Sequence, residues 1–419
     1  MAQRRLLIVT QHFWPENFRI NDIVDGLLAD GIAVDVLCGL PNYPKGEWFP
    51  GYTARGPLNE RYETSCGAAR VFRSREIPRR GNTGPRIFAN YVSWPLTAAA
   101  ALRRLPGGYD AVLCYNTSPV LMVWPAMLAS RRFRAPLTAY ILDIWPENLY
   151  SVLPVKNRLL RAVASGVSDR LYRRADRLIA LSPGLEARLR QRVGEKTAPR
   201  CIEKTRRYAV IPQYCEDFYA VPACDEALQA EGAGRFTVLF AGNFSPAQSL
   251  ETALHAMAEL KKQGRDDVRL VLVGDGMSRP SLEALCDTLG LRDRVRFYGS
   301  VPPQRVPALA GAADALLVSL SDSPDLGLTI PAKLASCMAA ARPLLVSLDG
   351  EGAAAARESG GALVSAACDV PALAENLRAL ADMPAERRAA MGQASFAHYT
   401  AHYRRDTLLA QLEEFIFTK

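Results

Sequence analysis

The sequence has few histidines, and its cysteines lack the spacing of metal sites and disulfide frameworks. It contains 4 His and 9 Cys in 419 residues. The cysteines are odd in number, scattered and without a Cys-x-x-Cys pair, which favours reduced, buried thiols over disulfides or a zinc site. Asp322 and Asp325 lack the short Asp-x-Asp spacing of metal–diphosphate sites. We therefore expect no essential metal.

Long hydrophobic runs are also missing. Charged residues or prolines interrupt every apolar stretch well short of the roughly 18–20 residues that a membrane span requires. The run Leu6–Val9 near the amino terminus is too short for a secretory signal peptide. No Gly-x-Ser-x-Gly turn or Ser-His-Asp arrangement is visible, which argues against those hydrolases. The scattered, reduced cysteines and the lack of a signal peptide predict a cytoplasmic protein.

The composition is that of a globular protein with two domains. Hydrophobic residues make up 49% and charged residues 22% of the chain, and its length allows two cores. The net charge of +8 hides an asymmetry: residues 1–210 hold 32 Lys and Arg against 17 Asp and Glu, and residues 211–419 hold 19 against 26. Segment 70–104 carries eight arginines and one acid, Glu76. Such a surface attracts nucleic acid, acidic lipid headgroups or pyrophosphates, although ordinary solvation is an alternative.

Strand-like and helix-like segments alternate in both halves, which predicts two doubly wound α/β domains with parallel sheets. We expect an N-terminal domain over residues 1–212 and a C-terminal domain over 213–397, with a helix over 398–419 that packs back on the first domain. In such sheets, ligands bind beyond the carboxyl ends of the strands. The expected strands are 6–10, 33–38, 111–115, 137–142, 175–181 and 208–211, then 237–241, 269–273, 295–298, 315–318 and 343–347.

Two glycine turns and one lysine stand out in the second half. Segment 242–248 links a strand to a helix through Gly242, and a helix N-terminus there could bind phosphate, although a plain turn is the alternative. Gly274 and Gly276 form a second turn that lacks the third glycine of a dinucleotide fingerprint. Lys333 falls in the first turn of an expected helix over 333–341, where the helix dipole disfavours a cation unless an anion also binds.

In the basic half, two segments combine carboxylates with Trp-Pro at expected strand ends. One is 12–19, His-Phe-Trp-Pro-Glu-Asn-Phe-Arg, and the other is 142–148, Leu-Asp-Ile-Trp-Pro-Glu-Asn. Asp143 and Glu147 could bind sugar hydroxyls or serve as a general base. The alternative is that each tryptophan packs a loop and that Glu147 caps a helix.

Together these stretches resemble a known family. With Gly39–Gly46, Phe240–Asn243, Pro331–Lys333 and Met338–Ala340, the chain looks like a retaining glycosyltransferase of family 4 with the GT-B fold, two Rossmann-like domains that face each other across a cleft. Within that family it resembles the WbuB-like L-fucosamine transferases of lipopolysaccharide O-antigen and surface polysaccharide assembly.

The resemblance implies a nucleotide-diphosphate sugar as donor, UDP-linked, with an N-acetylated amino or deoxy sugar among the candidates. It implies no cofactor besides this substrate. Asp143, Glu147 and Lys333 are the expected catalytic residues. The expected donor-binding residues are Glu16, Arg19, Gly242, Asn243, Gln248, Gly274, Ser300, Val301, Lys333 and Ser336.

Two features depart from the family pattern. Ser336 stands where a ribose-binding Glu is usual, and segment 244–248 lacks the Arg and Lys that commonly clamp the diphosphate. Lys333 and Arg19 are the expected replacements. The implied mechanism is front-face transfer with retained configuration, in which the leaving phosphate takes the acceptor proton and the enzyme stabilises the developing charge.

Family acceptors also give the basic half a role. They are often glycans on a polyprenyl diphosphate at the inner face of the cytoplasmic membrane, so we expect a peripheral protein on an anionic surface. Arg79, Arg80, Arg86 and Trp94 are the expected acceptor and membrane contacts, with a core helix that has one wet face as the alternative.

Three rival functions stay open at this point. A UDP-sugar 2-epimerase can share the fold and would need no acceptor. A nucleic-acid-binding protein would use the basic half, but no helix-turn-helix, zinc or RNA-platform signature is present. An NAD oxidoreductase is disfavoured by the incomplete glycine fingerprint.

Overall fold

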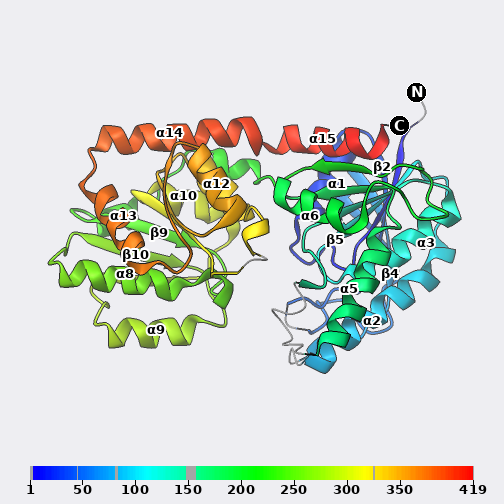
Figure 1. Ribbon diagram of the computed structural model, residues 1–419, viewed down its shortest axis with the longest axis horizontal. Coiled ribbons are helices and arrows are strands. Elements are labelled where there is room, and N and C mark those ends of the chain that lie inside the picture. Colours follow the sequence, from blue (N-terminus) through cyan, green and yellow to red (C-terminus); the bar gives the residue numbers. More distant parts are fainter. Residues whose placement is uncertain (1–2, 45, 81–83, 148–156, 324–325, 419) are drawn as a thin grey trace. The chain divides into compact units, whose positions relative to one another are not determined.

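A computed structural model describes residues 3–44, 46–80, 84–147, 157–323 and 326–418. The chain divides into two compact units, each shown with its own sheet in Figure 1. The first unit comprises Met1–Ile211 and the chain's tail, Leu409–Lys419, and the second comprises Pro212–Leu408. The predicted fold class, α/β with two mostly parallel sheets, is confirmed.

The first unit holds an eight-stranded sheet in the order β3-β4-β2-β1-β5-β6-β7-β8. Strand β1 is central, with Leu6 opposite Val34 of β2 and Ala111 of β5. All pairs are parallel except the β3–β4 hairpin, which the sequence did not reveal because its outer strand is polar and only half-buried. The strands are β1 Arg5–Val9, β2 Ala33–Gly39, β3 Asn59–Thr64, β4 Gly67–Ser74, β5 Ala111–Asn116, β6 Leu137–Ile141, β7 Arg177–Ala180 and β8 Arg207–Val210.

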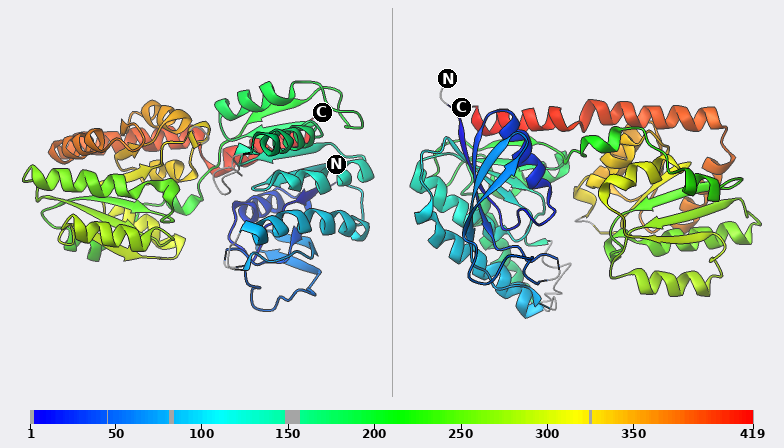
Figure 2. Two further views of the ribbon diagram at one scale, coloured as in Figure 1. Left: turned by 60° about the horizontal axis from the view of Figure 1, so that its bottom comes forward. Right: turned by 180° about the vertical axis from the view of Figure 1, so that it is seen from behind.

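Helices α2, α3 and α5 lie side by side along one face of this sheet (Figures 1 and 2).

The tail helix α15 is hydrogen-bonded to a buried arginine of the first unit. Arg177 donates to the carbonyl oxygens of Phe415 and Ile416 at 2.7 and 2.6 Å, which satisfies acceptors left open in a last helical turn. The helices are α1 Arg19–Ala29, α2 Gly84–Ala101, α3 Val123–Phe133, α5 Arg158–Tyr172, α6 Pro183–Val193 and α15 Arg405–Phe417.

The second unit holds a six-stranded, fully parallel sheet in the order β11-β10-β9-β12-β13-β14. Its strands are β9 Phe236–Ala241, β10 Val268–Val273, β11 Val295–Gly299, β12 Ala315–Ser319, β13 Leu344–Ser347 and β14 Ala362–Ser365. Its helices are α7 Glu226–Glu231, α8 Leu250–Lys262, α9 Arg279–Thr288, α10 Val306–Gly311, α11 Ala332–Ala339, α12 Gly350–Glu358, α13 Val370–Asp382 and α14 Ala385–His402.

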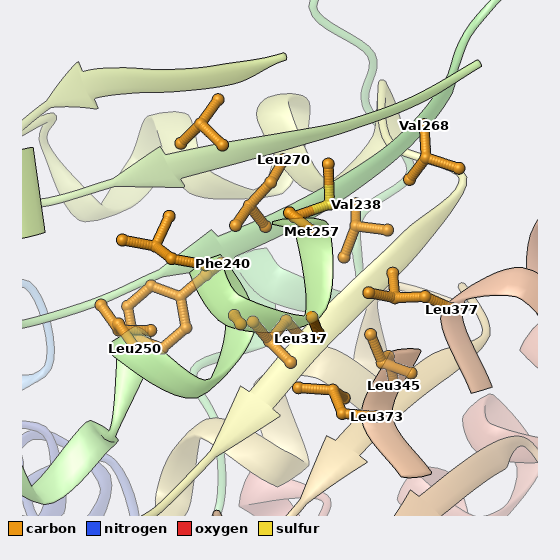
Figure 3. Packing of buried hydrophobic residues seen from close by; sticks show 14 of the residues in the cluster. Val238, Phe240, Leu250, Met257, Val268, Leu270, Leu317, Leu345, Leu373 and Leu377 are labelled. Atoms are coloured by element: carbon orange, nitrogen blue, oxygen red, sulfur yellow. The ribbon is translucent and has the colours of Figure 1, made fainter. Parts of the chain in front are cut away.

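The central strands of this sheet are buried on both faces, which explains their nearly continuous apolar sequence. Figure 3 shows one of the two cores, where Val238 and Phe240 of β9 and Leu270 of β10 meet Met257 of α8 and Leu373 of α13. Each fully buried side chain of this kind contributes about 1.5–3 kcal/mol. This packing fixes the strand ends on which the second unit's loops are mounted.

The carboxyl-terminal region differs from the expected single helix. Helix α14 ends at His402 and α15 begins at Arg405. The apolar spacing continues through the break and no Gly or Pro marks it, so periodicity gave no sign of it. Helix α7, ahead of β9, is also absent from the sequence-based expectation. Within the described part of the chain, no helix is long and apolar enough to cross a membrane.

Candidate functional site

In the second unit, the loops that follow β9 and β10 each contain a glycine whose backbone lies very close to a neighbouring residue. Gly242 follows β9 with φ of 153°, and a Cβ there would lie 2.7 Å from Nζ of Lys333. Gly274 follows β10 with φ of 133°, and a Cβ there would lie 1.9 Å from the carbonyl oxygen of Gly242. Only glycine fits these positions. The glycine turns found in the sequence therefore lie against each other and against Lys333.

Lys333 is the centre of this arrangement. It lies in the first turn of α11, and its Nζ donates to Oε1 of Gln248 at 2.6 Å and lies 3.4 Å from the centroid of the Phe240 ring. Burial lowers the pKa of Lys333 to about 7, and the nearby Cys337 opposes that shift. A cation at a helix N-terminus, among glycines, can bind the oxygens of an anion such as phosphate.

The loop that carries Gln248 is fixed by β12. Ser319 donates through Oγ to the carbonyl oxygen of Gln248 at 2.6 Å, and the Ser321 amide donates to that of Ala247 at 2.9 Å. These bonds fix the position of Gln248 relative to the sheet. The segment 243–248 is therefore held beside Lys333.

The other predicted donor residues surround the same strand ends. Asn243 is exposed directly after Gly242, and Ser336 is half-buried one turn after Lys333 on α11. Ser300 and Val301 follow β11; Ser300 is exposed, whereas Val301 packs against the core. The structure thus places these side chains at the carboxyl edge of the second sheet, where doubly wound folds bind ligands.

In the first unit, the loop after β1 holds a buried histidine–carboxylate pair. Nδ1 of His12 lies 2.8 Å from Oε2 of Glu16, and the His12 ring stacks on Phe18 at 4.8 Å. The other Glu16 oxygen accepts from the amides of Asn42 and Tyr43, both at 2.7 Å. Glu16 therefore joins the loops that follow β1 and β2, and its predicted contact with the donor stays a prediction.

A second buried carboxylate lies beside this pair. Glu76 accepts from Nε2 of Gln11 at 2.6 Å and from the side-chain amide of Asn42. Burial raises the pKa of Glu76 to about 8, and the negative charge of Glu16 adds to the rise. Gln11 also donates to Asn90 of α2 at 2.9 Å. The sequence showed Glu76 only as a lone acid among arginines, and no local signal revealed this network.

Arg19 and Asp143 both approach the end of β5. Burial raises the pKa of Tyr115, the positive charge of Arg19 opposes the rise and the carboxylate of Asp143 adds to it. Both side chains are half-buried, Arg19 as the first residue of α1 and Asp143 just after β6. Two predicted site residues of opposite charge therefore lie within electrostatic range of one tyrosine at the carboxyl edge of the first sheet.

Glu147 forms ion pairs with arginines of the first unit. Its carboxylate pairs with Arg192 at 3.1 Å and with Arg188 at 3.5 Å, both on α6. Trp145, two residues earlier, donates through Nε1 to Ser118 at 3.0 Å. Trp145 is buried, as expected for a tryptophan that packs its loop, whereas the catalytic role and the helix-capping role of Glu147 both stay predictions.

The predicted membrane contacts on and before α2 separate into two kinds. Arg80 and Arg86 are exposed. Arg79 is half-buried and donates to Oδ1 of Asn90 at 3.0 Å. Trp94 is fully buried, so its prediction as a surface contact is wrong: it lies on the inner side of α2, where an apolar ring gains most from burial. Trp94 is therefore a core residue.

The described residues contain no group of three or more His, Cys, Asp or Glu side chains that could hold a metal ion. Asp322 is exposed after β12, and Asp325 lies outside the described residues.

Two family models match the chain. Residues 17–202 match the glycosyl transferase 4-like domain, and residues 235–383 match glycosyl transferases group 1. The first match covers most of the first unit and the second contains the Gly242, Gln248 and Lys333 cluster. Together the two matches cover far more than half of the chain.

Curated relatives are also glycosyltransferases. The chain is 33% identical to alpha-D-kanosaminyltransferase of Streptomyces kanamyceticus over 35% of its own length and 40% of the relative. It is 28% identical to the probable glycosyltransferase WbjE of Pseudomonas aeruginosa over 56% of each protein. The chain thus spans about two fifths to just over half the length of these curated relatives.

Solved structures share the fold over the whole chain. Anabaena HepE in complex with UDP and glucose aligns with a TM-score of 0.67 and 16% identity over 100% of both chains. WaaG, a glycosyltransferase involved in lipopolysaccharide biosynthesis, aligns with a TM-score of 0.67 and 17% identity over 99% of this chain and 100% of WaaG. With both family models matched in order, the chain belongs to the group 1, glycosyltransferase 4-like family of GT-B-fold glycosyltransferases.

Proposed function

We propose that the protein is a retaining glycosyltransferase that moves a sugar from a UDP-linked donor to a lipid-linked or polysaccharide acceptor. We propose an N-acetylated amino or deoxy sugar as the sugar that is transferred, as in the WbuB-like group that the sequence resembles. One observation carries the proposal: Lys333 lies at the N-terminus of α11 beside Gly242 and bonded to Gln248. HepE, with the same fold, has been solved with UDP and glucose, which favours this donor class.

The second unit would hold the donor diphosphate. Gly242 leaves the backbone bare next to Nζ of Lys333, so a phosphate oxygen can reach both the ammonium group and the amides of the first turn of α11. The Phe240 ring beneath Lys333 attracts the ammonium charge through its π face. Because burial lowers the pKa of Lys333 to about 7, an arriving anion would favour the charged form. The lysine would then be fully cationic when donor is bound.

The reaction would rely on charge stabilisation at this cluster. As the glycosidic bond to the diphosphate breaks, negative charge grows on the leaving oxygen, and Lys333 with the helix amides would stabilise it. The leaving phosphate would accept the proton of the acceptor hydroxyl, so the new bond forms on the face that the diphosphate leaves. No cofactor besides the donor enters this scheme.

The first unit would position the acceptor. Arg19 and Asp143 lie at the carboxyl edge of its sheet, and we assign them to the polar groups of the acceptor and donor. Glu16 would act indirectly, because it holds the loops after β1 and β2 together. We further propose that the acceptor is carried on a polyprenyl diphosphate, so that the protein works as a peripheral enzyme at the inner face of the cytoplasmic membrane.

The proposal is tested by donor binding and transfer with the full chain. Isothermal titration against UDP- and GDP-sugars should show micromolar binding of one UDP-sugar. Lys333→Met should weaken that binding by about 100-fold, since a buried charged contact of this kind is worth roughly 2–3 kcal/mol. Lys262→Met is the matched control, because Lys262 is exposed on α8 and pairs with Glu259 on the same helix.

Transfer is then measured with detergent-solubilised polyprenyl-diphosphate glycans, and the anomeric configuration of the product is read by NMR. A retained anomeric centre in a product of the acceptor supports the proposal. An epimerised UDP-sugar formed without acceptor would instead identify a 2-epimerase. A protein that binds none of the nucleotide sugars would refute the donor site.

A further inference from the structure

The outer side of helix α5 is apolar, although it faces water. Leu159, Leu160, Val163 and Val167 are between 43% and 72% exposed, and their spacing places them on one stripe of the helix. Ser168, Leu171 and Tyr172 of the same helix are buried. The helix therefore has two apolar faces, and among the residues that the structure describes only one of these faces packs into the core of the first unit.

An arginine-lined cavity lies at the carboxyl end of this helix. It has a volume of about 320 Å³ and is lined by Gly166, Arg170, Arg173, Arg174 and Ala198. Arg173 and Arg174 are held by backbone carbonyl oxygens, of Arg192 at 3.0 Å and of Pro199 at 2.6 Å. The described lining includes no carboxylate, so the cavity presents positive charge to a ligand.

The neighbouring helix adds to this charge. Burial lowers the pKa of Arg131 on α3, and the positive charges of Arg174 and Arg200 lower it further. Helices α2, α3 and α5, which lie side by side (Figures 1 and 2), contain a single acidic residue, Asp169. That acid is paired with Arg192 at 2.6 Å. This helical layer is thus almost free of negative charge.

We propose that the outer face of α5 and the arginine cavity at its end dock on an anionic phospholipid bilayer. The leucine and valine side chains enter the headgroup region, and Arg170, Arg173 and Arg174 receive a lipid phosphate. Helices that lie in a membrane interface combine exposed apolar side chains with arginines. The outer face of α5 and the described lining of the cavity, which includes no carboxylate, show this combination. Phe88 and Leu96, exposed on α2, extend the apolar part of the layer.

This inference deepens the proposed function and rests on it for its purpose, because a polyprenyl-linked acceptor would be presented at such a surface. It also changes which residues make the contact. Trp94 is buried and Arg79 is engaged with Asn90, so the apolar anchor is supplied mainly by α5, with Phe88 and Leu96 of α2 beside it.

The test is co-sedimentation of the full chain with vesicles. The wild-type protein should bind vesicles of equal parts phosphatidylcholine and phosphatidylglycerol, release at high salt, and bind phosphatidylcholine alone much more weakly. Leu159→Ser, Leu160→Ser and Val163→Ser combined should lower the partition coefficient at least about tenfold. Arg170→Glu with Arg174→Glu should lower it by about 30-fold or more, since each charge near an anionic surface is worth about fivefold.

Matched controls come from equally exposed positions elsewhere. Val221→Ser with Met277→Ser removes exposed apolar side chains from the second unit, and Arg61→Glu reverses an exposed charge on β3. Both variants should bind vesicles like the wild type. Far-ultraviolet circular dichroism and Tm then verify that every variant is folded, which exposed positions favour.

Several outcomes would overturn the inference. Stripe variants that sediment like the wild type would show that another surface binds, and equal binding to neutral vesicles would remove the role of the arginines. Displacement by inorganic phosphate at low concentration, with normal binding by the stripe variants, would identify a free-phosphate site. A wild type that binds donor and transfers to a soluble acceptor but does not sediment refutes this inference alone, whereas one that sediments but binds no nucleotide sugar refutes only the proposed function.

Discussion

Glu76 is a buried acid that should make the first unit more stable when it is protonated. Burial and the charge of Glu16 raise its pKa to about 8. Because the folded pKa lies above that of the unfolded chain, near 4.5, this group's contribution is fully present below about pH 4.5 and is lost as the pH rises to about 8. A shift from 4.5 to about 8 corresponds to about 5 kcal/mol.

Glu76→Gln should therefore stabilise the first unit at alkaline pH. The neutral amide keeps the size of the side chain but meets two donors, on Gln11 and Asn42, so about 1 kcal/mol is lost in hydrogen bonding. When this loss is subtracted from the cost of about 5 kcal/mol that ionised Glu76 imposes on the wild type, we expect the variant to gain about 2–4 kcal/mol at pH 8.5. That gain would raise Tm by about 5–15 °C for a unit of this size. At pH 5 the variant should equal the wild type or be slightly less stable.

The assay is urea unfolding followed by tryptophan fluorescence, because all five tryptophans lie within residues 1–211 and so report on the first unit. The free energy of unfolding is measured at pH 5, 7 and 8.5 for both proteins. Glu63→Gln, at an exposed position on β3, is the control and should follow the wild type. Parallel pH profiles for Glu76→Gln and the wild type, or a variant that is less stable at pH 8.5, would show that Glu76 is not held protonated.

Three further predictions concern the proposed site. If the ammonium form of Lys333 binds the diphosphate, the Kd for UDP should rise up to about tenfold per pH unit above pH 7, because burial lowers the pKa of Lys333 to about 7; titration calorimetry should show no such slope for Lys333→Met. Gly242→Ala should weaken UDP binding at least about tenfold, since the new Cβ would lie 2.7 Å from Nζ of Lys333, and an unchanged Kd would contradict that contact. Glu147→Gln should leave kcat within about threefold and lower the free energy of unfolding by no more than about 1 kcal/mol, because its carboxylate serves α6 arginines; a loss of kcat by two orders of magnitude would restore it as a catalytic residue.

The sequence alone predicted the α/β class, the family and the strand ends on which the candidate residues lie. Alternating apolar strands and amphipathic helices are local patterns, and parallel sheets follow from them. Gly242, Gly274 and Lys333 were also visible locally, as glycine turns and as a lysine in an unfavourable position on its helix. Their assembly into one cluster follows from the rule that parallel strands end at the same edge of a sheet.

Only the tertiary structure decided which charged and aromatic side chains are available. Glu16, Glu147 and Trp94 look functional in sequence but are bonded or buried by partners many residues away, such as Asn42 for Glu16 and Arg192 for Glu147. Gln248 reaches Lys333 from 85 residues away, and the helical period of α5 could not tell its core face from its exposed one. Periodicity shows that a side chain lies on a stripe, but long-range packing determines whether water, protein or a ligand covers that stripe.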